Sequence, residues 1–559
     1  MNLRTFLVAL ALGGTTYQIN ASPIEQAGDR YIVHVPELDL RGDESLMDIL
    51  LMCPDVITLD NRTTLSDDPL ANLYGTFVIR FDNVEYGLDY STLLHNLKAK
   101  EIEKIQVCMN TDVMKGTGSQ KKVIDIHLRK DVGTEKISGR VGLFGDTYGG
   151  GEAITSVRYH GNNLSILSHV EGNMQRSAID GAPTNHRSHE GAKVNLTWDI
   201  TNRDNLMFTA TQTYTRNRFT GTPVDYQRYN NVELDYLRTL SQNGASMLLT
   251  LALDHTGDNG DIHHSRSTYP YTILEFNFPL FTPNLWITAG FEGGLSYKRD
   301  CIAKETSKSD YEDFYAQADL TLGKWGFMVG DRYRRTNTSN HNAFTVSAYH
   351  HLNAHRTLQA SFSQQFYNAV LGDIDQKPVY RAELKHTFQK KKFFLSTVIR
   401  YIGQDLNEGK VKTFNFGNTF FWHIGMLRLT AGISSYKEEL TKHEVYNHGF
   451  DNENRYIPGD IPENETGSLN KSEKIKSQYF VFKFAPQLSL PGDWRFTATM
   501  LWSTHRSESS LSYAPANLYA EAAVYKTISR HWLLEVRYHD IATQHLGNRA
   551  ATIGCTYYF

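Results

Sequence analysis

The segment Trp532-Leu533-Leu534-Glu535-Val536-Arg537-Tyr538-His539 alternates between two kinds of side chain. Apolar and aromatic side chains occupy every second position, namely Trp532, Leu534, Val536 and Tyr538. The positions between them are mostly polar or charged, namely Leu533, Glu535, Arg537 and His539. A period of two places each set on its own side of a β-strand. Residues 494–503 alternate in the same way. A soluble β-sandwich also shows this pattern, so alternation alone predicts strands without fixing their arrangement.

Segments of this kind recur from about residue 137 to the end of the chain. They start near Ile137, Ala153, Asn163, Ala192, Asn205, Asn231, Ala245, Thr268, Asn284, Asp313, Lys324, Ala343, Arg356, Val379, Lys392, Lys412, Gly425, Ser477, Asp493, Ala516, Arg530 and Ala550. The series predicts a membrane all-β fold, in which residues 131–559 form an antiparallel transmembrane β-barrel of about 22 strands. Counts of about 20 or 24 strands are also compatible with the boundaries. A barrel this wide needs its lumen closed.

The connections between these segments alternate in length. Short links such as Thr201–Asp204 and Pro491-Gly492 are separated by longer polar ones such as Met174–Gly191 and Ser435–Lys474. Outer-membrane barrels pair short periplasmic turns with long extracellular loops. An even strand count then predicts that both chain ends lie in the periplasm.

The aromatic residues support this orientation. Six of the seven tryptophans lie beside the short turns, namely Trp198, Trp286, Trp325, Trp422, Trp494 and Trp532, and only Trp502 lies elsewhere. Indole is favoured at a membrane interface, so these residues predict a girdle at the periplasmic side. Stabilisation of hairpins by cross-strand pairs is the alternative explanation. The last segment, residues 551–559, ends on Tyr557 and Phe559, which resembles the terminal-strand signal read by the barrel-assembly machinery.

Composition excludes several classes of protein. The 559 residues include 31 Tyr and 28 Phe but only 15 Pro, a balance that favours strands. The mean hydropathy of −0.43 is compatible with a barrel, whose strands average lipid-facing and lumen-facing residues. A net charge of −4 argues against a nucleic-acid partner. No enzyme motif occurs, so we expect no catalytic site and no cofactor. The polar segment His443–His448 lacks the spacing of a zinc site, and we expect no bound metal.

The N-terminus predicts export. Arg4 is followed by the apolar run Phe6–Leu12 and by small residues that allow cleavage after Ala21, which is typical of a signal peptide spanning residues 1–21. The four cysteines are too few for a disulfide scaffold. Cys53 and Cys108 could pair in an oxidising periplasm, although the sequence cannot show that their geometry fits.

Residues 37–130 differ from the barrel in their sequence pattern, which predicts a small α/β domain. Helices are expected at Ser45–Met52 and around Tyr90–Leu97. Strands are expected at residues 56–59, 77–81, 105–109 and 123–128. Such a domain lies where a plug would enter the barrel.

Four pieces of this domain resemble motifs of TonB-dependent receptor plugs. Leu46-Met47-Asp48-Ile49-Leu50 followed by Cys53-Pro54-Asp55-Val56 resembles their opening "dlL…lPGV". Val78–Val84, which contains Asp82, resembles their "vlvDGv" turn. Residues 99–107, with Ile102, Ile105 and Val107, resemble "a.dIekIEVi". Residues 122–130, with Ile124 and Ile126, resemble the closing "gvInI.lkk".

In this order, the four pieces resemble the Bacteroidota-type outer-membrane-barrel receptor family, and with the barrel the resemblance covers nearly the whole mature chain. It implies a receptor in the outer membrane of a Gram-negative bacterium that imports a siderophore, glycan, peptide or cofactor. It also implies contact with outer-membrane lipid and a TonB-type energy-transducing partner. Related receptors pair with surface lipoproteins, although no residue here reports one. The ligand-binding residues cannot be read from the sequence.

Two departures from the family pattern concern residues 22–36 and what precedes the plug. The regulatory domain common upstream in this family is not seen between the signal peptide and the plug. The best candidate for a TonB-coupling segment is Tyr31-Ile32-Val33-His34-Val35, an extended stretch able to pair as an added strand. It can equally be the first strand of the plug. A non-transporting plugged barrel that serves as a structural partner, and a passive porin, therefore remain alternatives.

Overall fold

The computed structural model describes residues 24–27, 30–38, 40, 44–53, 56–59, 64–66, 77–81, 84–85, 97–108, 122–129, 137–161, 163–177, 185–219, 224–241, 243–259, 264–337, 340–365, 379–390, 392–406, 409–444, 471–504, 518–529, 531–542 and 547–559. The predicted signal peptide lies outside these residues. Within the described part of the chain, no helix is long and apolar enough to span a bilayer.

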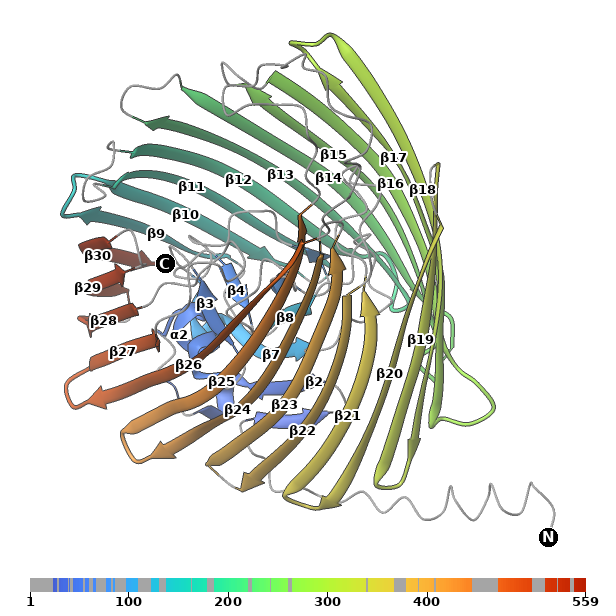
Figure 1. The fold of residues 1–559 in the computed structure, drawn as a ribbon. Coiled ribbons are helices and arrows are strands. Elements are labelled where there is room, and N and C mark those ends of the chain that lie inside the picture. Colours follow the sequence, from blue (N-terminus) through green and yellow to red (C-terminus); the bar gives the residue numbers. More distant parts are fainter. Residues whose placement is uncertain are drawn as a thin grey trace, which may run out of the picture.

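The larger part of the molecule is a closed antiparallel barrel of 22 strands. Their bounds are β9 Ile137–Asp146, β10 Gly151–His160, β11 Leu164–Ser177, β12 Asn185–Asp199, β13 Asp204–Phe219, β14 Asp225–Thr239, β15 Ser246–Asn259, β16 His264–Pro279, β17 Leu285–Asp300, β18 Glu305–Leu322, β19 Trp325–Thr336, β20 Asn340–Asn353, β21 Arg356–Gln365, β22 Val379–Lys390, β23 Phe393–Leu406, β24 Gly409–Ile424, β25 Leu427–Glu444, β26 Lys471–Leu490, β27 Trp494–Ser503, β28 Leu518–Thr527, β29 Trp532–Ala542 and β30 Gly547–Tyr558. Each strand pairs with its neighbours in sequence, and β30 returns to β9 (Figure 1). The predicted strand number is confirmed.

The strands extend further at the long-loop end than the sequence indicated. The sequence predicts a loop at Ser435–Lys474, but β25 continues to Glu444 and β26 begins at Lys471. The two extensions form a ladder, with the Lys474 ammonium 3.0 Å from a carboxylate oxygen of Glu439. Alternation of apolar and polar residues ends where a strand leaves the membrane, whereas backbone hydrogen bonding continues. The pattern therefore ended these strands too early.

The two faces of the barrel wall have opposite polarity. On β29, Trp532 and Val536 are 45% and 53% exposed on the outside, whereas Glu535 is 4% exposed toward the lumen. This arrangement is that of a barrel in lipid, with apolar side chains outward and polar ones inward. The six tryptophans predicted to form a girdle all stand at the short-turn ends of their strands, namely β12, β17, β19, β24, β27 and β29.

The N-terminal domain is a sheet of six strands in the order β1-β2-β7-β8-β5-β6. Its elements are β1 Ile24–Ala27, β2 Arg30–His34, β5 Phe77–Phe81, β6 Val84–Glu85, β7 Ile102–Cys108 and β8 Lys122–Leu128, with a separate hairpin of β3 Ile57–Leu59 and β4 Thr64–Ser66. Strands β5 and β8 are parallel, and the other pairs are antiparallel. The helix α2, Leu46–Met52, and the 3₁₀ turns η1, Val35–Leu38, and η2, Ala99–Glu101, complete it. The helix expected around Tyr90–Leu97 lies almost wholly outside the described residues.

This domain lies inside the barrel, and we call it the plug (Figure 1). Its apolar core contains eight of the motif residues, each with no exposed surface: Leu46, Leu50, Val56, Ile102, Ile105, Val107, Ile124 and Ile126. Two side chains of the barrel wall, Phe394 and Phe421, belong to the same buried cluster. Plug and barrel therefore share a core along β23 and β24. The motif residues Pro54 and Asp82 lie outside the described part of the chain.

Candidate functional site: the interface between plug and barrel

The start of helix α2 carries the acidic side of the interface. Ser45 caps the helix, because its Oγ accepts a hydrogen bond from the Asp48 backbone N–H at 3.1 Å. The Asp48 carboxylate in turn accepts one from the Ser45 N–H at 3.0 Å, which completes a capping box. The cap fixes the carboxylates of Glu44 and Asp48 on the side of the helix that meets the barrel wall.

Two arginines of the barrel wall face these carboxylates. Arg495 of β27 has its guanidinium nitrogens 3.6 Å from Glu44 Oε1 and 3.7 Å from Asp48 Oδ2. Arg428 of β25 lies 3.9 Å from Glu44 Oε1 and donates a hydrogen bond to the Leu38 carbonyl at 3.2 Å. Arg495 and Glu44 are fully buried. Buried charges of this kind are tolerable only as a set, so removing one member leaves the others unpaired.

The other end of α2 is held by a lysine. The Lys483 ammonium of β26 donates to the Cys53 carbonyl at 2.8 Å and to the Val56 carbonyl at 2.6 Å. Carbonyls at a helix C-terminus lack partners within the helix and carry partial negative charge, which a cation satisfies. The barrel wall thus holds α2 at both ends. Cys53 is a buried thiol that takes part in no disulfide, and its Sγ donates to the Ile49 carbonyl at 3.5 Å, so the pairing with Cys108 that the sequence left open is not formed.

The rest of the plug is held by weaker contacts around the wall. The Tyr31 ring lies 6.4 Å from the Phe394 ring and 5.3 Å from the Lys385 ammonium. On the opposite side, Arg158 donates to the Arg129 carbonyl at 2.7 Å. The plug therefore touches both β22–β23 and the barrel seam near β9 and β10.

Lys98 of the plug is a buried cation in this interface. Burial lowers the pKa of its ammonium from 10.5 to about 8, and the nearby guanidiniums of Arg140 and Arg495 lower it as well. The carboxylates of Glu535 and Asp48 oppose this shift. Lys98 is thus a plug group whose charge responds to mildly alkaline pH.

The candidate coupling segment is part of the plug sheet. Residues Tyr31–His34 lie in β2, which pairs with β1 on one side and β7 on the other, and Val35 begins η1. Tyr31, Val33 and Val35 are buried, and Ile32 and His34 are half-buried. With both edges occupied, this segment cannot accept an added strand in the described conformation. The sequence left open whether this segment is a coupling segment or a strand of the plug, and in the structure it is the second strand of the plug sheet.

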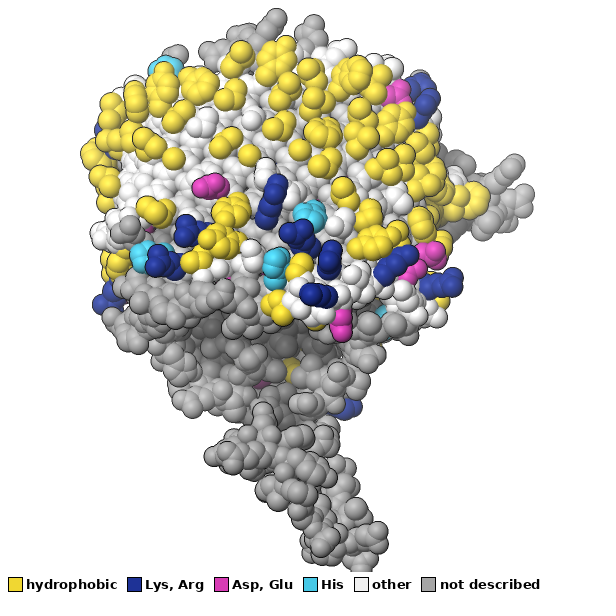
Figure 2. Space-filling view, turned by 90° about the horizontal axis from the view of Figure 1, so that it is seen from above, with side chains coloured by type: hydrophobic (Ala, Val, Ile, Leu, Met, Phe, Trp, Pro, Cys, Tyr) yellow, Lys and Arg dark blue, Asp and Glu magenta, His cyan; other side chains and the backbone are white. Residues whose placement is uncertain are grey.

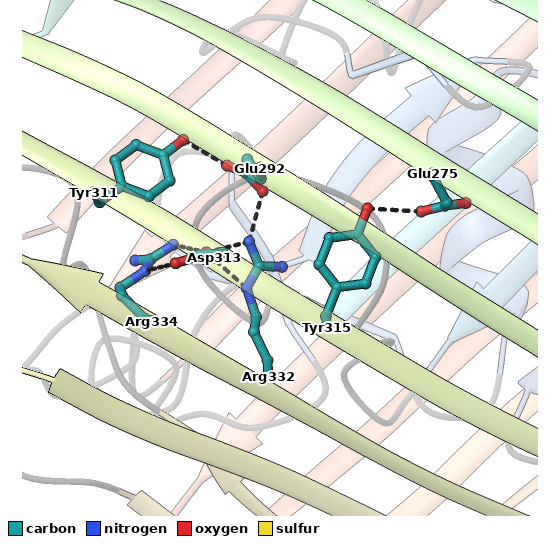
Figure 3. A network of polar contacts seen from close by, with 7 residues as sticks. All are labelled: Glu275, Glu292, Tyr311, Asp313, Tyr315, Arg332 and Arg334. Carbon is teal, nitrogen blue, oxygen red and sulfur yellow. Dashed lines mark hydrogen bonds and ion pairs between the residues drawn. The ribbon is translucent and has the colours of Figure 1, made fainter.

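A second polar cluster lies in the wall of the lumen, on β16 to β19 (Figure 3). Arg332 donates to Asp313 Oδ2 at 2.7 Å and to Glu292 Oε2 at 2.6 Å, and Arg334 donates to Asp313 Oδ1 at 2.6 Å. The hydroxyls of two tyrosines donate to carboxylates, Tyr311 to Glu292 and Tyr315 to Glu275. We did not predict this cluster. The only signal was polar residues at alternate positions, which every lumen-facing strand shows.

A smaller lumen cluster joins two histidines through one carboxylate. Glu171 lies 3.0 Å from His169 Nε2 and 3.2 Å from His189 Nε2, and His189 Nδ1 lies 2.9 Å from Thr215 Oγ1. Within the described residues, no set of three His, Cys, Asp or Glu side chains is arranged to hold a metal ion.

Comparison with solved structures identifies the architecture. The siderophore receptor PirA from Pseudomonas aeruginosa superposes with a TM-score of 0.67 at 12% identity, covering 96% of this chain and 100% of that one. This chain has the fold of TonB-dependent outer-membrane receptors. The ferric enterobactin receptor PfeA from the same organism gives a TM-score of 0.67 at 11% identity, over 96% of this chain and 100% of that one. The FrpB iron transporter from Neisseria meningitidis gives 0.67 at 10% identity, over 95% of this chain and 100% of that one.

No protein-family model matches the sequence, and no curated protein matches it. This fold is shared by solved proteins that are named as receptors and as an iron transporter. It also confirms the predicted architecture of an outer-membrane barrel with an N-terminal plug. In this fold the short turns are periplasmic and the long connections extracellular.

Proposed function

We propose that this chain is an outer-membrane receptor that imports a ligand through its barrel when a periplasmic partner displaces the plug. The observation that carries the proposal is the clamping of α2 inside a closed 22-stranded barrel by Arg428, Arg495 and Lys483. A lumen of this width would pass solutes freely without a plug. Separating buried charges from their partners is costly, so these contacts oppose displacement of the plug.

The second question is the class of ligand that the barrel imports. The sequence leaves siderophores, glycans, peptides and cofactors open. The solved proteins that share this fold include a siderophore receptor, a ferric enterobactin receptor and an iron transporter. Ferric siderophores are therefore the first class of ligand to test.

Coupling to a TonB-type protein is the second part of the proposal. Strand β1 forms the edge of the plug sheet, and an edge strand can accept a further strand from a partner. A pull on β1 would reach β2, whose Tyr31 packs near Phe394 of the wall. Prolines at the β1 positions whose N–H faces the open edge should abolish capture of the purified TonB-type periplasmic domain. Unchanged capture would show that the partner does not bind through β1. No capture by the wild type would favour the alternative of a structural partner, such as a barrel paired with a surface lipoprotein.

Conductance in planar bilayers tests the seal itself. The full-length mature protein should be silent, and deletion of residues 23–130 should produce a large steady current, because the deletion removes the plug. Gel migration before and after boiling should show that the deletion variant still forms a barrel. Free conduction by the full-length protein would instead support a passive porin.

A further inference from the structure

The outer surface of β13 to β17 carries a group of arginines near the loop ends of four of these strands, β13, β14, β16 and β17. All five are exposed and stand at outward positions, namely Arg216, Arg218, Arg228, Arg266 and Arg299. Nearer the middle of the same strands, the exposed outward residues are apolar, among them Val232, Leu251 and Leu253. Figure 2 shows this belt of apolar side chains and a band of Lys, Arg and His side chains along its border. The arginines therefore stand where the barrel leaves the acyl region of the outer leaflet.

Three of these arginines form one row across four strands. Arg228 of β14 pairs with Gly257 of β15, Gly257 pairs with Arg266 of β16, and Arg266 pairs with Arg299 of β17. Arg266 and Arg299 are thus directly opposite each other, an arrangement of like charges that destabilises a sheet. A Cβ atom added at Gly257 would meet nothing within 4 Å, so the row contains an open notch between two guanidinium groups.

These arginines are not neutralised by neighbouring carboxylates in the described part of the chain. Arg228 donates to the Asn230 side chain at 3.4 Å, and Arg216 lies over the Tyr226 ring at 5.6 Å. Among the described outward positions of β13 to β17, the acidic residue is Asp204, at the turn end and 3.7 Å from Arg238. Glu190 of β12 borders the row but is separated from Arg228 by Tyr214. The row is a concentration of positive charge facing the membrane.

We propose that the row Arg228–Gly257–Arg266–Arg299 binds the phosphate groups of the phosphorylated glycolipid in the outer leaflet. Guanidinium groups bind phosphate through paired hydrogen bonds. Two strand spacings separate Arg228 from Arg266, roughly 10 Å, which lets both side chains reach one phosphate seated over Gly257. The acyl chains of the same lipid would cover the apolar belt beside it. This inference rests on the outer-membrane location and not on transport.

The first test measures retention of bisphosphorylated lipid A by the full-length protein in detergent, using native mass spectrometry. The triple variant Arg228→Gln/Arg266→Gln/Arg299→Gln should bind it at least about ten-fold more weakly than the wild type. The wild type should show a similar loss with dephosphorylated lipid A. A matched variant at the turn end, Arg203→Gln/Arg238→Gln/Lys324→Gln, loses the same charge and should bind as the wild type does. Equal binding by the two triple variants would overturn the proposal.

A second test leaves the charge unchanged. Gly257→Leu fills the notch, whereas Gly172→Leu fills an equally open outward position on β11, outside the row. We expect Gly257→Leu to weaken binding by roughly three- to ten-fold and Gly172→Leu to have no effect. Heat-modified gel migration checks that both variants form barrels. Wild-type affinity in Gly257→Leu would contradict a phosphate seated over this glycine.

Discussion

Arg495 is the residue on which seating of the plug depends most. It is fully buried, and its guanidinium faces Glu44 and Asp48 at 3.6 and 3.7 Å. Arg495→Met removes the positive charge that faces both carboxylates. Removal of one partner from a buried ion pair typically costs about 3–5 kcal/mol. We expect the variant to show frequent channel openings in planar bilayers, where the wild type is silent. Arg332→Met, in the lumen cluster on another wall, is the control and should leave the channel closed.

The same contact can be tested from the plug side. Combining Glu44→Gln with Arg495→Met removes a charge from each partner, so the double variant should open less often than Arg495→Met alone. If the effects of the two substitutions on opening frequency instead add, Glu44 and Arg495 do not act as a pair.

Lys98 gives the plug a dependence on alkaline pH. Its pKa of about 8 in the folded chain lies below the ordinary lysine value of 10.5. Between these values the unfolded chain holds a proton that the folded chain has released, so stability rises with pH across this window, by at most about 1.4 kcal/mol per pH unit. Below pH 8 both states are protonated, and this contribution is constant and unfavourable. Chemical denaturation at pH 7.5 and 9.5 should show the rise.

Two substitutions at this position separate charge from titration. Lys98→Met should lose the pH-dependent rise and be more stable than the wild type at pH 7.5. Lys98→Arg should also lose the rise but stay as unstable as the wild type at pH 7.5, because arginine keeps its proton. An undiminished rise in Lys98→Met would assign the pH dependence to another group.

At the scale of elements, the seam between β30 and β9 decides whether the barrel closes. Phe559 and Gly139 exchange backbone hydrogen bonds of 2.9 and 3.0 Å. A Cβ at Gly139 would lie 2.3 Å from the Phe559 ring and 2.6 Å from the Ser156 carbonyl oxygen, whereas one at Gly145 on the same strand would meet only a carbonyl oxygen at 4.0 Å. Gly139→Val should therefore lower the temperature at which gel migration shifts, and Gly145→Val should not. An equal decrease in this temperature for the two variants would show that β9 tolerates an added side chain at neither position.

The strands were predictable because each one carries its own signal. The alternation from Trp532 to His539 predicts a strand with one apolar and one polar face, without information from any other strand. The difference in polarity is large because one face contacts the membrane. The helix α2 was predictable for the same reason, since Ser45 and Asp48 form a local capping box. The extensions of β25 and β26 were missed, because outside the membrane both faces are polar and the local signal disappears.

At the scale of the whole molecule, the candidate site was not predictable from the sequence. The contact between Glu44 and Arg495 joins residues far apart in the chain, and many lumen-facing arginines could have made it. The row of Arg228, Gly257 and Arg266 depends on the register of three strands, which a single sequence does not specify. The position of Tyr31 in β2 was left open because an extended segment reads alike as a free arm or a strand.

The plug and the barrel should also differ in resistance to denaturant. Every barrel strand is paired on both sides, whereas the plug sheet ends at β1 and β6 and is held to the wall by side chains. Rising urea should therefore open the channel before the barrel unfolds, with conductance appearing while gel migration is still that of the folded barrel. Arg495→Met should move the first transition to lower urea and leave the second in place, because the arginine joins the plug to the wall without pairing barrel strands. A single transition in both measurements would mean that plug and barrel unfold as one unit, and the partner would then have to remodel the barrel as well as the plug.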